Sequence, residues 1–405
     1  MRIVFFTGKG GVGKTTTAAA TAVRLAQRGT KTLLLSADAA HSIGDVLGRP
    51  LTDQPVEVAD GLAAAQLDPQ RRLEAAWGVV HRHLAGLLEH GGADTIAAEE
   101  LAVLPGVEEV LALLAVRDHA AAGRYDAIVV DCGPSAETLR LLAVPDTLAW
   151  YLERILPMQR RLARGTRPLA GLLGARGAVP PDGLFDAVLA LAEDLRSVRE
   201  LVGNPDVSRV RLVLTPESMV VAEARRTFTA LSLYGYQLDA VVANRVLAKG
   251  AGAWATAWRN AQSEQLAAVT ESFPGVPLHQ ASYRSHEPIG IGELAAVADE
   301  LYGELPGEEP IADPPQQGQF LSVRADGADF VLTVALPLAD SDAVAAARSG
   351  DDLVLTVAGH RRLVALPSVL RRCQVGGGRF ADGVLQLRFS RDPELWPRDT
   401  AEDAR

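Results

Sequence analysis

The chain has 405 residues, of which 48% are hydrophobic and 22% are charged, which is ordinary for a globular protein with room for two or three domains. Its net charge of −10 disfavours a protein that tracks nucleic-acid phosphates over a broad basic surface. Two distant cysteines, Cys132 and Cys373, exclude a disulfide framework, fit no metal-binding spacing and favour a cytoplasmic location. We recognise neither a signal peptide nor an apolar run long enough to form a transmembrane segment.

The main body of the chain alternates short apolar runs with helical stretches such as Lys14–Arg28. Val, Ile and Leu fill the runs without polar alternation, which is typical of parallel strands covered on both faces. We therefore predict an α/β fold with a doubly wound, mostly parallel sheet over residues 1–302. The expected strands are Ile3–Thr7, Thr32–Ser36, Ala127–Asp131, Val210–Thr215 and Leu238–Asn244.

Two stretches interrupt this alternation. Residues 53–120 and 146–205 show helical periodicity and no convincing strand. They predict a helical subdomain inserted into the sheet domain. Within the second stretch, Met158–Arg176 carries five arginines, which fits either a solvated helix face or a surface that docks an acidic partner or anionic lipid.

A glycine-rich segment follows the first expected strand and opens the first expected helix. It matches the phosphate-loop pattern G-x-x-x-x-G-K-[ST], in which backbone N–H groups and a helix N-terminus face phosphate oxygens. Lys14 is expected to reach the β- and γ-phosphates, and the Thr15 hydroxyl to ligate Mg²⁺. The segment therefore predicts ATP and Mg²⁺ as ligands. The expected ATP-binding residues in it are Gly8, Lys9, Gly10, Gly11, Val12, Gly13, Lys14, Thr15 and Thr16.

Three further side chains stand at places suited to a ligand. Lys9 is either a solvated loop lysine or a second cation that requires a bound polyanion. Asp38 follows the second strand, where ligands bind in open α/β sheets, although a helix N-cap is the other interpretation. Asp131 ends the third strand, where an acidic residue holds Mg²⁺ directly or through water.

The segment GKGGVGKTT resembles the deviant phosphate loop of the class of ATPases that contains MinD and the arsenical pump. In that class the early lysine, here Lys9, crosses a homodimer interface to the partner's phosphates, so the resemblance implies a homodimer and a catalytic role for Lys9 beside Lys14. Ser36–Ser42 is similar to the first switch of the arsenical pump-driving and tail-anchored-protein-targeting ATPase family. The resemblance gives Asp38 the role of positioning the attacking water, while Ala37 and Ala39 replace the family's Thr and Pro.

Other segments extend this resemblance over about residues 1–302. Cys132–Leu142 is similar to the family's second switch, without its histidine, and Leu104–Glu109 is similar to the segment before a long family helix. Asn244 matches the family asparagine that hydrogen-bonds adenine. An ordinary strand-ending turn residue is the other interpretation of Asn244.

The pattern changes after residue 302. Residues 303–319, rich in Pro, Gly and Glu, predict a linker. Alternating segments then predict a small all-β sandwich over residues 320–391, followed by a loosely ordered tail, 392–405. The alternating segments are Phe330–Leu336, Asp352–Ala358 and Val384–Phe389, with turns at Asp326-Gly327 and Asp382-Gly383. Leu353–Phe389 resembles the α-crystallin-type domain of small heat-shock proteins.

Together these features predict a dimeric, Mg²⁺-dependent ATPase that acts as a nucleotide switch on a protein client or a membrane-associated partner, with no nucleic-acid ligand. A positioning ATPase of the MinD or ParA type stays open, although two prolines within Asp392–Pro397 disfavour a membrane-binding helix there. An ATPase associated with arsenite or anion transport also stays open, although two cysteines cannot supply three thiols. A relative of the nitrogenase iron protein would need paired cysteines.

Overall fold

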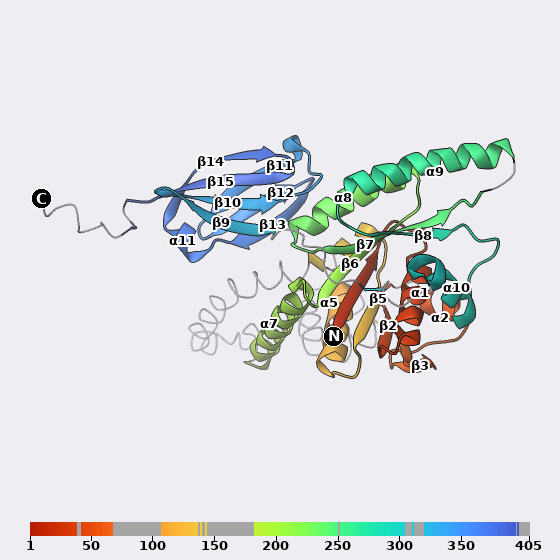
Figure 1. Cartoon of the computed structure of the whole chain (residues 1–405). Helices are drawn as coiled ribbons and strands as arrows, with labels where there is room; N and C mark the ends of the chain where they lie inside the picture. Colours follow the sequence, from red (N-terminus) through yellow and green to blue (C-terminus); the bar gives the residue numbers. More distant parts are fainter. Residues whose placement is uncertain are drawn as a thin grey trace, which may run out of the picture.

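A computed structural model gives the structure of the chain. It describes residues 1–38, 42–67, 107–136, 138–139, 142–143, 182–249, 252–303, 310–311, 320–393 and 395–396. Figure 1 shows an α/β region followed by an antiparallel β region. Much of the predicted helical subdomain, the segment Met158–Arg176 and most of the predicted linker lie outside the described residues.

Eight strands form the sheet of the α/β region, in the order β3-β4-β2-β5-β1-β6-β7-β8. All neighbouring strands are parallel except β3 and β4. This arrangement confirms the predicted fold class. The strands are β1 (Arg2–Thr7), β2 (Thr32–Ser36), β3 (Val56–Ala59), β4 (Leu62–Gln66), β5 (Ala127–Asp131), β6 (Ser208–Leu214), β7 (Leu238–Val246) and β8 (Leu278–Ser282).

Helices cover this sheet on both sides. Helices α1, α2 and α10 lie together on one side, and α5 and α7 lie on the other (Figure 1). Alanines of α1 such as Ala18, Ala19 and Ala22 are fully buried, and their small side chains let α1 approach the sheet and α10 closely. The helices are α1 (Lys14–Gln27), α2 (Ser42–Leu47), α5 (Val107–Ala121), α7 (Asp182–Gly203), α8 (Ser218–Leu233), α9 (Ala253–Ser272) and α10 (Ile291–Tyr302).

The prediction that residues 53–120 contain no strand is wrong, because β3 and β4 lie within them. Strand β4 reads Leu-Ala-Ala-Ala-Gln, and alanine is depleted in strands on average. Burial overrides that preference here, since Ala64 and Ala65 are inaccessible beside β2. Strand β3 is a short antiparallel edge strand with two exposed residues, so it carries a weak apolar signal.

The C-terminal region is a small β-sandwich. One sheet has the order β14-β15-β10-β9, the other has the order β11-β12-β13, and their inner faces share one hydrophobic core. The predicted turn Asp382-Gly383 joins β14 to β15 with both residues at positive φ (51° and 72°), as a two-residue hairpin requires. The elements are β9 (Leu321–Asp326), β10 (Asp329–Ala335), β11 (Val344–Ser349), β12 (Asp352–Val357), β13 (His360–Ala365), β14 (Cys373–Ala381), β15 (Val384–Arg391), α11 (Ser368–Arg371) and the 3-10 turn Ser341–Ala343.

The two regions meet at the C-terminal end of α8. Leu233, the last residue of α8, is fully buried and belongs to the core of the β-sandwich rather than to that of the α/β region. The Arg362 guanidinium of β13 donates a hydrogen bond to the Leu233 carbonyl at 2.8 Å. Among the described residues, none of the helices combines the length and the apolar character that a bilayer crossing requires.

Candidate active site

The phosphate loop adopts a backbone that requires glycine at two positions. Gly8 has φ +153°, and a Cβ there would lie 2.0 Å from the Val213 carbonyl oxygen of β6. Gly13 has φ +93°, and a Cβ there would lie 2.2 Å from the Asn244 amide nitrogen of β7. The loop is therefore seated directly against the ends of two neighbouring strands, and its shape depends on these contacts.

The N-terminus of α1 is suited to binding an anion. Within α1, all of which the structure describes, no acidic residue occupies the first turn, and no side chain caps its N-terminus. The first N–H groups of a helix lack partners within the helix and carry partial positive charge. Lys14 is buried, and its Nζ donates to the Lys9 carbonyl at 3.3 Å. Lys14 thus folds back over the loop, where phosphate oxygens are expected.

Parallel register brings the predicted acidic side chains to this loop. Asp131 pairs with Phe6 of β1 on one side and with Ser36 of β2 on the other. The Ala37 N–H donates to the Asp131 carbonyl at 2.8 Å, which fixes the start of the segment that leads to Asp38. The carboxyl ends of β1, β2 and β5 therefore gather Lys14, Asp38 and Asp131 at one edge of the sheet.

Asp131 is an unusual carboxyl group. It is fully buried, and neither of its oxygens has a hydrogen-bond partner among the described residues. Burial raises the pKa of Asp131 to about 7, against the lowering effects of the Thr15 hydroxyl and Lys14, while the Asp38 charge raises it further. Buried polar groups normally find partners. An orphaned carboxylate beside a threonine hydroxyl is a fitting place for a cation with oxygen ligands such as Mg²⁺.

The Lys9 side chain contacts helix α8, whereas that of Lys14 contacts the phosphate loop. The Lys9 Nζ lies 3.4 Å from Glu223 of α8, and 40% of the Lys9 side chain is exposed. The same Glu223 carboxylate accepts a hydrogen bond from the Ser135 hydroxyl at 3.2 Å. In the single chain Lys9 is therefore held by α8.

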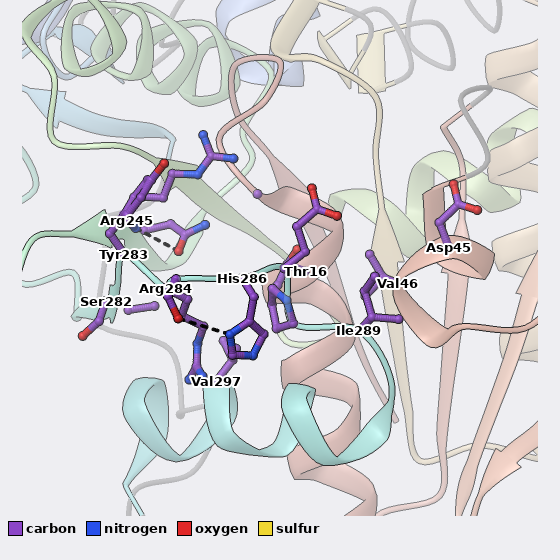
Figure 2. A pocket seen from close by; sticks show the side chains of 16 residues that line it. Thr16, Asp45, Val46, Arg245, Ser282, Tyr283, Arg284, His286, Ile289 and Val297 are labelled. Carbon is purple, nitrogen blue, oxygen red and sulfur yellow. Dashed lines mark hydrogen bonds between the residues drawn. The ribbon is translucent and has the colours of Figure 1, made fainter.

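A pocket of about 470 Å³ opens beside the helix end of the phosphate loop. Figure 2 shows that it is framed by Thr16, by the end of β7 and by the segment between β8 and α10. That segment is held in place by hydrogen bonds from the Ser282 N–H and the Arg284 guanidinium to Glu300 of α10, at 2.8 and 2.6 Å. The pocket is lined by Gly13 and Thr16, so it adjoins the part of the loop where phosphate oxygens are expected. Its lining residues are Gly13, Thr16, Asp45, Val46, Asn244, Arg245, Val297 and residues 281–289.

Asn244 lines this pocket but is already engaged. Its amide nitrogen donates to the Val12 carbonyl at 2.9 Å, and its amide oxygen accepts the Arg245 N–H at 2.9 Å. Arg245 has φ 58°, a left-handed conformation that is uncommon for a residue with a side chain. In this state Asn244 braces the phosphate loop, and its predicted contact with adenine stays a prediction.

The sequence patterns missed two parts of this site. The loop after β8, with Tyr283 and His286, was not recognised because β8 reads Leu-His-Gln-Ala-Ser and lacks an apolar run. Glu223 was missed because a contact across more than two hundred residues leaves no local pattern. Within the first-switch segment, residues 39–41 lie outside the described residues, as does Glu137 of the second-switch segment.

Comparisons with known proteins match both regions. Residues 1–303 match the family of anion-transporting ATPases, and residues 327–389 match the HSP20-like domain found in ArsA. The chain is 32% identical to the "Putative arsenical pump-driving ATPase" of Chlorobaculum tepidum, over 96% of both chains. It is 37% identical to Protein Rv2184c of Mycobacterium tuberculosis, over 98% of this chain and 97% of the relative. The "ATPase ASNA1 homolog" of Babesia bovis is 28% identical, over 74% of this chain and 82% of its own length.

Proposed function

The chain belongs to the anion-transporting ATPase family and carries that family's HSP20-like domain, and from this premise we propose that it hydrolyses ATP to ADP and phosphate as a dimeric nucleotide switch. One observation carries the proposal. An anion-ready phosphate loop and the orphaned Asp131 carboxyl lie side by side at one sheet edge. A site for phosphate next to a site for a divalent cation suits a nucleoside triphosphate with its metal.

The residues of the chain divide the work of catalysis. The loop N–H groups and Lys14 bind and orient the phosphates, which supplies much of the catalysis in phosphoryl transfer. Asp38 orients the attacking water and accepts its proton as the water oxygen bonds to the γ-phosphorus and the bond from that phosphorus to the leaving ADP oxygen breaks. The β8–α10 segment and Arg245 hold the nucleoside in the adjacent pocket.

The Thr15 hydroxyl and Asp131 are the residues that would hold Mg²⁺, Asp131 directly or through water. Bound Mg²⁺ would neutralise charge that develops on the phosphate oxygens. Burial raises the pKa of Asp131 to about 7, and its ionised carboxylate is the form that would hold the cation.

We further propose that two chains close on ATP and that Lys9 acts in trans. Its 3.4 Å contact with Glu223 holds the Lys9 ammonium outside its own phosphate cradle, where a second copy could receive it. A cation that arrives only in the closed dimer stabilises the transition state without binding the substrate in the open monomer. Hydrolysis would then loosen the dimer and change the hold on a protein client or membrane-associated partner in the cytoplasm.

Phosphate release by the purified chain, with ATP and Mg²⁺, tests this function. Wild-type protein should turn over ATP, and Lys14→Ala should reduce turnover at least a hundredfold, since the loss of a charge-stabilising group in a closed site costs about 10²–10³ in rate. Lys31→Ala, which removes an exposed lysine, is the matched control and should keep wild-type activity. Equal turnover by Lys14→Ala and Lys31→Ala would refute hydrolysis at this site.

A further inference from the structure

Helix α8 joins two parts of the molecule that the proposed function treats separately. Its first half carries Glu223, which faces the phosphate loop, and its last residue, Leu233, lies in the core of the HSP20-like domain. Ten residues separate them, which is about 15 Å along an α-helix. The α8 sequence between them contains neither glycine nor proline, so the helix has no built-in kink.

In the first half of α8, Glu223 holds the Lys9 side chain, which the proposed dimer requires at the partner's phosphates. Glu223 pairs with Lys9 at 3.4 Å and accepts the Ser135 hydroxyl at 3.2 Å. Ser135 is itself tied to the phosphate loop, because its N–H donates to the Gly8 carbonyl at 3.1 Å. Lys9 cannot hold Glu223 and reach a partner chain's phosphates at the same time. Glu223 therefore distinguishes the open chain from the closed dimer.

The far end of α8 is firmly seated in the HSP20-like domain. The Thr229 hydroxyl donates to the Pro337 carbonyl at 2.9 Å, and the Tyr234 hydroxyl donates to the Arg361 carbonyl at 3.4 Å. Arg362 donates to the Leu233 carbonyl and lies over the Phe320 ring, 4.7 Å from its centroid. Apolar burial, hydrogen bonds and a cation–π contact thus hold the same helix end, so α8 and the domain are packed as one unit there.

We propose that Glu223 is a positioning residue for Lys9 and that α8 makes its position depend on the HSP20-like domain. This proposal rests on the trans role of Lys9 in the proposed function. While the domain holds α8, Glu223 keeps Lys9 away from a second chain. When Lys9 binds the nucleotide of a partner chain, Glu223 loses its contact with the Lys9 ammonium, and α8 becomes free to shift. Because such coupling is reciprocal, a domain that is displaced by a client would favour closure.

A double-mutant cycle tests the coupling. ATP turnover per chain is measured against protein concentration for wild type, Glu223→Gln, Arg362→Ala and the double variant. Glu223→Gln should lower the concentration that gives half-maximal turnover about fourfold, because an exposed ion pair shifts an equilibrium about twofold and each dimer releases two. The maximal rate should change less than about twofold, whereas a merely structural loss would lower it. Glu271→Gln, at an exposed glutamate of α9, should behave as wild type.

Arg362→Ala should also lower the half-maximal concentration in the wild-type background, since it loosens the far end of α8. In the Glu223→Gln background it should have almost no further effect, because no Lys9 contact is left to relax. Thr229→Val removes a hydrogen bond from the same interface and replaces Arg362→Ala if that variant does not fold. Equal effects in both backgrounds would mean that the sites are independent and would overturn the proposal. Concentration-independent turnover per chain by wild-type protein that native mass spectrometry shows to stay monomeric with ATP would instead refute the trans role of Lys9 itself.

Discussion

Replacement of the buried Asp131 by asparagine should stabilise the nucleotide-free chain in a pH-dependent way. The Asp131 carboxyl has its ordinary pKa of 3.8 when unfolded and a pKa of about 7 when folded, so the folded chain binds this proton more tightly. The contribution of Asp131 to stability is therefore greatest below about pH 4 and falls as pH rises towards 7. At 1.36 kcal/mol for each pKa unit, the charged carboxylate costs up to about 4 kcal/mol above pH 7. The side-chain amide of the Asp131→Asn variant carries no charge and escapes this cost.

Urea unfolding of both proteins at pH 5 and pH 8, without Mg²⁺ or nucleotide, measures the effect. From the same two pKa values, the advantage of Asp131→Asn over wild type should grow by about 2–3 kcal/mol between these pH values. The change with pH, rather than the absolute difference, is the readout, because the amide changes local hydrogen bonding equally at both pH values. Mg·ATP at pH 8 should stabilise wild type more than the variant. A pH-independent difference would refute the claim that the burial of Asp131 costs more than its interactions with Thr15 and Lys14 recover.

Three further outcomes follow from the geometry of the site. Asp38→Asn should keep ATP binding but lower hydrolysis by about 10² or more, the scale of a positioned base; parallel losses in a nucleotide-binding assay would assign Asp38 a structural role. Gly13→Ala should abolish binding of a fluorescent ATP analogue, because its Cβ would meet the Asn244 amide nitrogen at 2.2 Å. Gly203→Ala, at the end of α7 and outside the candidate site, is the matched control, since a Cβ there meets no described atom within 4 Å, and wild-type affinity is expected; equal losses in both variants would contradict the observed loop shape. Leu233→Ala should destabilise the HSP20-like domain by about 2–5 kcal/mol, measured as loss of hydrogen-exchange protection in β12, and unchanged protection would refute the shared core.

The sequence predicts the centre of this molecule better than its edges. Strands β1, β2 and β5 are mostly apolar runs because both of their faces are buried, and the apolar pattern predicts each of them. Strand β6 is also predicted, although it carries the buried Arg211, which pairs with Asp239 of β7. It does not predict β3, β4 and β8, because an edge position or an alanine-rich face weakens the apolar signal. In the β-sandwich, β14 contains three consecutive glycines, which local preference assigns to a loop.

The candidate site likewise has parts that the sequence predicts and parts that it does not. Its phosphate loop is one contiguous segment in which each residue has a local task, so the pattern alone predicts it. The acidic residues Asp38 and Asp131 were predictable because parallel strands end at a shared edge. The orphaned state of the Asp131 oxygens, the bracing of the loop by Asn244 and the Lys9–Glu223 pair depend on tertiary distances. No spacing in the sequence encodes those distances.

The central claim is that two chains build each active site, with Lys9 of one completing the phosphate cradle of the other. A mixing experiment tests it most directly. Lys9→Ala and Lys14→Ala chains should each be nearly inactive alone. In a mixed dimer, confirmed by native mass spectrometry, the Lys9→Ala chain keeps its Lys14 and receives Lys9 from its partner, so one of two sites should recover. Activity that stays at background in confirmed mixed dimers, or full activity of Lys9→Ala alone, would contradict the claim.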